Sequence, residues 1–338
     1  MLVSLGLLAA ACGKSTAKPD YGYPLDDKLR LNHLQMKGTH NSYHIQPENP
    51  QADEWRYTHL PLADQLEKQG VRQFELDVHY HSDEGRFHVY HLPTLDDRST
   101  CALFTDCLTQ LLTWSNAHPG HHPLFVYIEP KDDIDADADK IIGHFDELDA
   151  EILKVWPRDR VLTPDDLQGS HPTLREAVLA EAWPTLGEMR GKIVFDLLTE
   201  DRAPGETHYD YTHGLKDLHG RTMFVTAQVT DPYAAVLKLD DPVGDAQAIK
   251  DAVSQGFIVR TYPGDPIVNG HATSRAQMDA AEASPAHMLS SDYPVPGIVA
   301  DYFLDLSGGT PSRCNPSVAP PDCTSDAIEG PTHLQARK

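Results

Sequence analysis

The sequence predicts an α/β protein whose parallel strands close into a (β/α) barrel, all in one domain. Short apolar runs alternate with amphipathic helical stretches along the 338 residues, and several of these runs end abruptly in charged residues. Strands that alternate with helices form parallel sheets, and roughly seven or eight such units close into a barrel. An open doubly wound sheet is the alternative, but no G-x-G-x-x-G or P-loop motif follows any strand.

The first half of the chain contains strand candidates that end in polar residues. The predicted elements are strands at 34–37, 74–81, 87–91 and 123–131 and helices at 60–69 and 107–117. The first of these helices stops at Gly70, and residues 83–86 form the turn of a hairpin. A buried run that ends in charge, as at 123–131, is typical of a parallel strand whose carboxyl end faces a site.

The second half of the chain repeats this alternation. Helices are predicted at 139–154, 173–180 and 245–255, and short strands at 192–196, 222–226, 257–260 and 287–292. After Leu306 the chain is rich in Pro, Gly, Ser and Thr, so we expect an irregular tail over 307–338. The barrel is therefore predicted to span 26–306.

The charge balance restricts the partners of this protein. With 28 basic and 51 acidic residues, the formal net charge is −23. Nucleic acids are held chiefly by Lys and Arg, so this composition argues against a nucleic acid partner. The same composition disfavours tight adsorption to anionic lipid. Acidic loops do attract divalent cations.

The N-terminus resembles an export signal. Residues 1–11 form an apolar run that ends in small residues before Cys12, and a polar spacer follows. The run is too short to span a bilayer as a helix. We predict a bacterial lipoprotein signal and tether over 1–25 with lipidation at Cys12, which would make the protein periplasmic or attached to the cell surface. An ordinary secretory signal is the alternative.

The other cysteines fit an exported protein. Cys101, Cys107, Cys314 and Cys323 form two locally spaced pairs in loop-like contexts. We predict disulfides 101–107 and 314–323. A zinc site is the alternative, but the intervals do not match paired C-x-x-C ligands.

The strand at 74–81 carries an unusual set of titratable side chains. Its period of two places Glu75, Asp77, His79 and His81 on one face and apolar residues on the other. Two close carboxylates repel each other and are costly to bury without a partner, so this face must meet water, protons or a cation. A metal site is our prediction, and a solvated strand face is the alternative.

Further oxygen ligands follow the neighbouring strands. In a barrel the strand ends would bring Asn41, Glu75, Asp77 and Glu129 together. Three carboxylates and an amide oxygen favour Ca²⁺ over Zn²⁺, which would prefer the nearby imidazoles. Mg²⁺ remains the alternative, because it also takes carboxylate ligands.

Two histidines are placed to act beside this cation. His40 and His91 lie on successive strand ends. Imidazoles that flank a metal can supply a general acid and a hydrogen-bond donor to the transition state of a phosphoryl reaction, where catalysis is mostly positioning and charge stabilisation.

Taken together, these motifs resemble a known enzyme family. The motifs are Gly38-Thr39-His40-Asn41-Ser42-Tyr43, Glu75-Leu76-Asp77-Val78, His91 with 96–101, Trp114 with His118-Pro119-Gly120-His121, Glu129-Pro130-Lys131 and Ser291-Asp292-Tyr293-Pro294. In order and residue type they resemble the bacterial calcium-dependent phosphatidylinositol-specific phospholipase C family over about residues 30 to 305. The resemblance implies a distorted TIM-type (β/α) barrel and a Ca²⁺ ion held by Asn41, Glu75, Asp77 and Glu129.

The resemblance also implies how the site works. The inositol 2-hydroxyl attacks the phosphorus, diacylglycerol leaves, and a cyclic inositol phosphate forms that can then be hydrolysed. By analogy, His40 steadies the charged transition state, His91 protonates the departing oxygen, and Glu75 or Glu129 acts as the base.

The same resemblance suggests substrate contacts and partners. Lys131 and Arg260 would face the phosphate or the inositol, and Tyr293 would form a wall of the pocket. The expected partners are a phosphoinositide or inositol phosphodiester and, transiently, a lipid surface, with the protein acting as a monomer. Two alternatives are a glycerophosphodiester phosphodiesterase, which usually carries His-Arg-Gly where this chain has His40-Asn41-Ser42, and a non-catalytic lipoprotein that binds inositol phosphates.

Overall fold

The computed structural model describes residues 19–132, 140–264, 267–268, 271–272, 274–299, 301–309 and 311–333. The predicted signal with Cys12, and residue 139 at the start of a predicted helix, lie outside these ranges. Within them, no helix is both long and apolar enough to cross a membrane.

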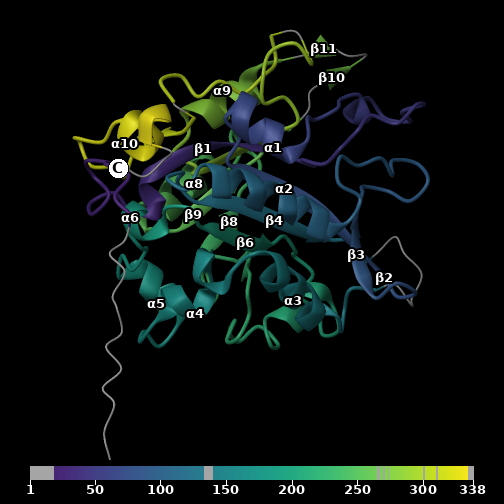
Figure 1. Ribbon diagram of the computed structural model, residues 1–338, viewed down its shortest axis with the longest axis horizontal. Helices are drawn as coiled ribbons and strands as arrows, with labels where there is room; N and C mark the ends of the chain where they lie inside the picture. The colour runs from purple at the N-terminus through teal and green to yellow at the C-terminus, as the bar shows by residue number, and fades with distance from the viewer. Residues whose placement is uncertain are drawn as a thin grey trace, which may run out of the picture.

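Parallel strands form the centre of the molecule (Figure 1). The strands of the barrel are β1 (Leu34–Thr39), β2 (Gln73–His81), β4 (Leu124–Pro130), β6 (Ile193–Leu197), β7 (Phe224–Val225), β8 (Val236–Lys238), β9 (Ile258–Thr261) and β12 (Met288–Ser291). They pair in the order β6-β4-β2-β1-β12-β9-β8, and the other edge of β6 pairs with both β7 and the short strand β5 (Val161–Leu162). This is the predicted (β/α) barrel.

The barrel is distorted at two of its seams. The edges of the sheet meet through a single parallel bridge between Thr226, which follows β7, and Val236 in β8. On the other side, β1 and β2 share only the pair Gly38 and Gln73. By contrast, β2 and β4 pair over Gln73–Val78. The strongest part of the sheet therefore carries the acidic residues of β2 and β4.

Helices cover the outside of the strands. They are α1 (Leu62–Asp64) with a π-helical turn at Gln65–Gln69, α2 (Phe104–Ala117), α3 (Phe145–Val155), α4 (Pro164–Gln168), α5 (Leu174–Leu179), α6 (Leu186–Met189), α7 (Thr207–Tyr211), α8 (Ala246–Ser254), α9 (Ala276–Ala283) and α10 (Ser325–Glu329). Short 3-10 turns lie at Leu31–His33, Asp53–Trp55, Arg158–Arg160 and Pro331–His333. Figure 1 shows the helices spread around the strands, and α2 packs beside both α1 and α3. These helices bury the outer face of the curved sheet, while its inner face lines the interior of the barrel.

Most predicted elements are present, with three kinds of difference: a helix that changes type, missed strands, and the missed helices α4, α6, α7, α9 and α10. The helix predicted at 60–69 ends at Gly70 as expected, where φ is 68°, but its second half is a π-helix. The predictions missed very short strands, because two or three residues carry too little periodicity to detect. The missed strands are β5 (Val161–Leu162), β8, β10 (Ile267–Val268), β11 (His271–Ala272) and β13 (Arg313–Cys314).

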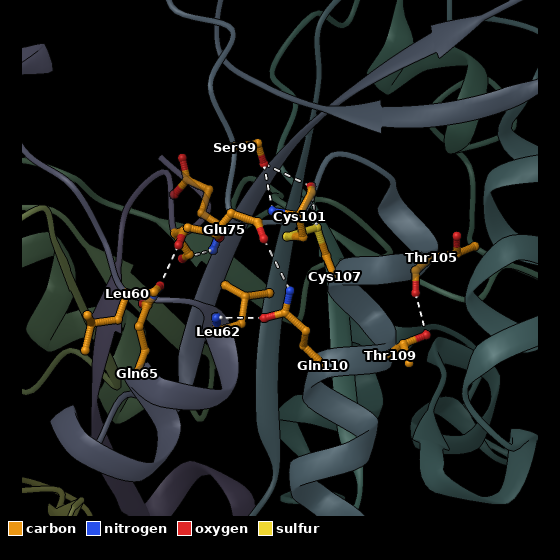
Figure 2. The surroundings of a disulfide bond; sticks show 12 residues. Leu60, Leu62, Gln65, Glu75, Ser99, Cys101, Thr105, Cys107, Thr109 and Gln110 are labelled. Carbon is orange, nitrogen blue, oxygen red and sulfur yellow. Dashed lines mark hydrogen bonds between the residues drawn. A yellow bond between two sulfur atoms is a disulfide. The ribbon is translucent and has the colours of Figure 1, made fainter. Parts of the chain in front are cut away.

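The predicted disulfides are both present. Cys101 bonds to Cys107, and Cys314 bonds to Cys323. Figure 2 shows how the first bridge attaches the loop after β3 (Arg86–Val89) to the start of α2. Beside it, the Gln110 side chain accepts a hydrogen bond from Leu62 N at 3.1 Å and donates one to Thr100 O at 3.4 Å. The loop, α1 and α2 are thus fastened together.

The C-terminal tail is more ordered than we predicted. It adds β13 to β1 and places α10 at the base of the barrel. At the end of α10, buried Glu329 forms an ion pair with buried Arg72 and accepts a hydrogen bond from His122 N at 3.0 Å. The predicted boundaries at residues 26 and 306 stay a prediction, but the tail clearly supplies a buried charge to the barrel.

We predict that Glu329→Gln destabilises the protein, because Arg72 would keep its buried charge without a partner. Breaking a buried ion pair from one side costs about 3–5 kcal/mol. Urea unfolding at pH 7 measures this loss, and replacement of the exposed Glu147 by Gln is the control.

The loss of stability caused by Glu329→Gln should depend on pH. Burial raises the pKa of Glu329, but Arg72 and His122 outweigh burial and bring it from 4.5 to about 2. A lowered pKa means that the carboxylate stabilises the fold fully above pH 4.5 and progressively less towards pH 2. The difference in unfolding free energy between the two proteins should therefore shrink over that window. A difference that stays constant with pH would contradict the assignment.

Candidate active site and metal centre

A cavity of about 620 Å³ lies at the carboxyl ends of the barrel strands. His40 after β1, Glu75 on β2, Glu129 on β4 and Arg260 on β9 all line it. Carboxyl ends of parallel strands meet at one end of a barrel, which is why residues far apart in sequence share this cavity.

The acidic residues predicted from the strand pattern come together. Glu75, Asp77 and Glu129 each offer a carboxylate oxygen, and these oxygens all lie within 4.8 Å of one another. Asp77 pairs with Glu129 in the register of β2 and β4. Glu75 is 1% exposed and Asp77 is 0% exposed, so the alternative of a solvated strand face is excluded.

Asp77 has the least compensated carboxylate of the cluster. Neither of its oxygens has a hydrogen-bond partner among the described residues, although Lys131 Nζ lies 2.9 Å from Oδ2 and supplies charge. Burial, opposed by Lys131, raises the pKa of Asp77 to about 7. Orphaned buried oxygens beside other carboxylates fit a hard cation, and this donor set is the one that Ca²⁺ takes.

Asn41 is held next to this cluster by its loop. Its φ of 40° is in the left-handed region, which Asn tolerates better than most residues. Its Oδ1 accepts a hydrogen bond from the Tyr43 hydroxyl at 3.4 Å. Burial and, after it, the charge of the nearby Asp77 raise the pKa of Tyr43.

His40 is fixed between two carboxylates. Its Nδ1 lies 2.8 Å from Asp292 Oδ1, and its Nε2 lies 3.5 Å from Glu75 Oε1. Burial lowers the pKa of His40, but Asp292 and Glu75 together raise it to about 10. The rings of Tyr262 and His40 pack together with 4.6 Å between their centroids, and the Tyr262 hydroxyl donates a hydrogen bond to Asp292 Oδ2 at 2.9 Å. This histidine is a charged donor that points towards the acidic cluster.

His91 approaches the cluster from the loop after β3. Its Nδ1 lies 2.9 Å from Asp96 Oδ2, and its side chain is 22% exposed. Burial raises the pKa of Glu129, but Lys131 and, more weakly, His40 and His91 hold it below the usual range. Both histidines are therefore close enough to influence Glu129.

Two of the three predicted substrate contacts reach the site. Lys131 Nζ lies 2.6 Å from Glu129 Oε1, and Arg260 donates to Glu75 Oε2 at 2.6 Å and to Asp240 Oδ2 at 2.7 Å. Tyr293, expected at the pocket wall, is not among the residues that line this cavity, and its role stays a prediction. It is 1% exposed and packs between Tyr57 and Tyr302, because the chain turns inward after β12.

A model of one protein family matches this chain. It is described as Ca²⁺-dependent phosphoinositide phospholipase C, and it covers residues 29–88 and 84–316. The chain belongs to this family. It is accordingly a Ca²⁺-dependent phosphodiesterase of the phospholipase C type.

Solved structures of this phospholipase C family share the fold. A Ca²⁺-dependent phosphatidylinositol-specific phospholipase C from Streptomyces antibioticus is 23% identical with a TM-score of 0.59, over 79% of this chain and 95% of that one. A calcium-dependent phosphoinositol-specific phospholipase C from a Gram-negative Pseudomonas species is 17% identical with a TM-score of 0.59, over 86% of this chain and 97% of that one. No curated protein sequence matches the chain.

The phospholipase site contains residues for which we predicted no role. Asp292 and Asp96 hold the two histidines, Tyr262 lines the cavity, and Asp240 pairs with Arg260. Asp292 directly follows a strand, and that position was a signal for a site residue. Asp96 lies in an irregular loop, where sequence spacing carries no such signal.

We predict that Asp77→Asn lowers the affinity of this phospholipase for Ca²⁺, because it removes a charged oxygen from the cluster. The loss should be at least about tenfold, since even substitutions behind metal ligands commonly cost that much. Isothermal titration with Ca²⁺ measures it.

Asp196→Asn is the matched control for this titration. Asp196 is also a buried carboxyl on a barrel strand, but it accepts a hydrogen bond from Thr226, and burial raises its pKa well above the usual range. Calcium affinity equal to wild type in Asp77→Asn would remove Asp77 from the ligand set.

Proposed function

We propose that the protein cleaves phosphatidylinositol into diacylglycerol and a cyclic inositol phosphate. The observation that carries this proposal is the acidic cluster with the orphaned oxygens of Asp77, flanked by His40 and His91. The inositol 2-hydroxyl oxygen forms a bond to phosphorus, and the bond from phosphorus to the glycerol oxygen breaks. The cyclic product can then be hydrolysed.

His40 stabilises charge in this reaction. Asp292 occupies its Nδ1, so the proton on Nε2 faces the cluster and can be donated in a hydrogen bond to a phosphate oxygen. Its raised pKa keeps it charged at neutral pH. A preorganised donor of this kind acts on the charge that develops in the transition state.

Protons are moved by the other side chains. His91 gives the proton from its Nε2 to the glycerol oxygen as that oxygen leaves, while Asp96 keeps its Nδ1 occupied. Glu75 or Glu129 takes the proton of the inositol 2-hydroxyl. Asn41, Glu75, Asp77 and Glu129 would hold Ca²⁺, which, when bound, lowers the pKa of a hydroxyl and offsets the negative charge of the phosphate.

The charge of the cavity favours an inositol without further phosphates. Its acidic lining residues are Glu75, Glu129, Asp132, Glu200, Asp201, Glu206 and Asp240, and its basic ones are His40, Lys140, Lys238 and Arg260. Additional phosphate groups on the ring would meet more negative than positive charge. A neutral ring of hydroxyls suits this mixture of donors and acceptors, with Arg260 and Lys131 as its charged contacts.

An assay on three substrates tests the function. We expect turnover of phosphatidylinositol, weaker turnover of its bisphosphate, and little turnover of deacylated glycerophosphoinositol. Activity on the deacylated compound alone would favour a glycerophosphodiester phosphodiesterase. Binding without turnover would favour a non-catalytic module.

We also infer where the protein works. The two disulfides agree with export, and lipidation at Cys12 would keep the protein at the membrane. As a monomer it would need only transient contact with lipid. Leu95, in the turn after His91, is 55% exposed, and Trp55 lies 5.9 Å from the His91 ring. The apolar side chains of Leu95 and Trp55 would meet the lipid surface beside His91, which protonates the departing glycerol oxygen.

We predict that His91→Ala impairs cleavage of phosphatidylinositol far more than cleavage of a nitrophenyl phosphodiester of inositol, because only a poor leaving group needs a proton. His40→Ala should slow both substrates, since the phosphate charge develops in either case. The losses should be of order 10²–10⁴. Equal losses on both substrates in both variants would show that the two roles are wrongly divided.

We predict that Leu95→Asn lowers activity on phosphatidylinositol vesicles by about three- to tenfold, because partial burial of a leucine in lipid contributes about 1 kcal/mol. Turnover of the soluble nitrophenyl substrate should not change. Leu153→Asn, at 39% exposure on α3, is the control. A parallel loss on both substrates would place the effect of Leu95 in folding instead of lipid contact.

A further inference from the structure

The two halves of the proposed calcium site lie on opposite sides of a weak seam in the barrel. Asn41 follows β1, whereas Glu75 belongs to β2, which pairs along six residues with β4. In the part of the chain that the structure describes, β1 and β2 share a single pair, Gly38 with Gln73. Regular strand pairing therefore does not fix the distance from Asn41 to Glu75.

Ser42 supplies the hydrogen bonds that a paired strand residue would otherwise make to Glu75. Its backbone N donates to Glu75 O at 2.9 Å, and its Oγ accepts from Glu75 N at 2.8 Å. A side-chain oxygen thus takes the place of a strand carbonyl, and the buried backbone groups of Glu75 are satisfied. Because Ser42 directly follows Asn41, these two bonds attach the Asn41 loop to β2.

Gln65 holds the same loop from the π-helical turn after α1. Its buried side chain donates from Nε2 to Ser42 O at 2.6 Å and to Leu60 O at 2.7 Å. Its Oε1 accepts from Thr39 Oγ1 at 2.8 Å, so the hydroxyl hydrogen of Thr39 is engaged. Ser42 is then the donor in its contacts with Thr39 Oγ1 at 2.7 Å and Thr39 O at 3.0 Å. The lone pairs of the Ser42 hydroxyl stay available for Glu75 N.

The backbone of Asn41 needs this support. Its φ of 40° lies in the left-handed region, which costs free energy for any residue with a side chain. Such a conformation persists where the surrounding structure fixes it, and Thr39 and Ser42, on either side of Asn41, are both bonded to Gln65. An amide oxygen that has to meet a cation together with carboxylates requires a backbone held in this way.

We propose that Ser42 is a positioning residue of the calcium site, which sets Asn41 at a fixed distance from Glu75 across the weak seam, and that Gln65 supports it. The inference rests on the proposed ligand set. The polar side-chain atoms of Ser42 and Gln65 are engaged within the protein, so they act through Asn41 and not as ligands. Their removal should therefore weaken Ca²⁺ binding only while Asn41 is present.

The test is a double-mutant cycle on Ca²⁺ affinity, measured by isothermal titration of CaCl₂ into full-length protein freed of metal with a chelator. Ser42→Ala removes the acceptor for Glu75 N. Asn41→Gly removes the amide ligand at a position whose φ suits glycine. We expect Ser42→Ala to raise the Kd about tenfold or more, as substitutions behind metal ligands commonly do. In the Asn41→Gly background the rise should stay below about threefold, because the group that Ser42 positions is already gone.

Gln65→Met is the second variant, in case Ser42→Ala does not fold. It preserves the approximate size of the side chain and removes the donor to Ser42 O. The Kd should rise less than in Ser42→Ala, by about threefold, because the bonds from Ser42 to Glu75 remain. This rise should also disappear in the Asn41→Gly background.

Ser284→Ala is the matched control. The buried Ser284 hydroxyl likewise accepts from a backbone N, that of Ala286 at 3.2 Å, and donates to a backbone carbonyl, that of Ala281 at 2.8 Å. It precedes β12, at the end of the barrel opposite the site. Its replacement should lower the melting temperature in chelator, as Ser42→Ala does, and leave the Kd for Ca²⁺ unchanged.

The outcomes separate this inference from the proposed ligand set. If Asn41→Gly leaves the Kd unaltered, the assignment of Asn41 as a ligand fails, and the inference fails with it. If Asn41→Gly raises the Kd but Ser42→Ala does not, or if Ser42→Ala raises it by the same factor in both backgrounds, the inference is wrong and the ligand set stands. A rise that depends on Asn41 and is absent from Ser284→Ala supports the inference.

Discussion

Three carboxylates in the interior of a barrel are the constraint on which this structure depends. Glu75, Asp77 and Glu129 come within 4.8 Å of one another, and the first two are almost completely buried. Like charges at such distances repel strongly in a medium of low dielectric, so the fold has to surround them with positive charge. Arg260 contacts Glu75, and Lys131 contacts Asp77 and Glu129. Even so, neither oxygen of Asp77 has a hydrogen-bond partner within the described parts of the chain, which is the deficit that a bound Ca²⁺ would meet.

The two histidines beside this cluster are held in the same way. His40 and His91 each present Nδ1 to a buried aspartate, Asp292 or Asp96, which leaves Nε2 available. The surroundings of the two pairs differ. Asp292 also accepts from Tyr262, a neutral group, whereas Asp96 also faces His44. Burial lowers the pKa of His40, but Asp292 and Glu75 raise it to about 10, so this histidine keeps the positive charge that a stabiliser of anionic oxygen requires.

The sequence alone was sufficient to predict site residues where a pattern repeats along a strand. The acidic alternation of β2 and the charged end of β4 identified Glu75, Asp77 and Glu129, since strand periodicity and barrel topology place such residues together. It was insufficient where a turn decides the direction of a side chain. Tyr293 and Tyr262 both follow a strand by one or two residues, and only the path of the chain shows that Tyr262 enters the cavity. The tail was also misjudged, because the buried partner of Glu329 is Arg72, more than 250 residues earlier.

The two ends of the barrel treat buried carboxylates in opposite ways. At the base, Glu329 is paired with Arg72 and hydrogen-bonded to the backbone of His122, and its pKa falls to about 2. At the carboxyl ends of the strands, Asp77 is equally buried but lacks hydrogen bonds, and its pKa rises to about 7. A buried carboxylate that is ion-paired and hydrogen-bonded, as Glu329 is, stabilises the folded chain without any ligand. An unsatisfied one destabilises it until a ligand binds, and any ligand that binds only the folded state adds its binding free energy to stability. Glu329 therefore belongs to the end of the barrel that maintains the fold. Asp77 belongs to the end that would bind a cation.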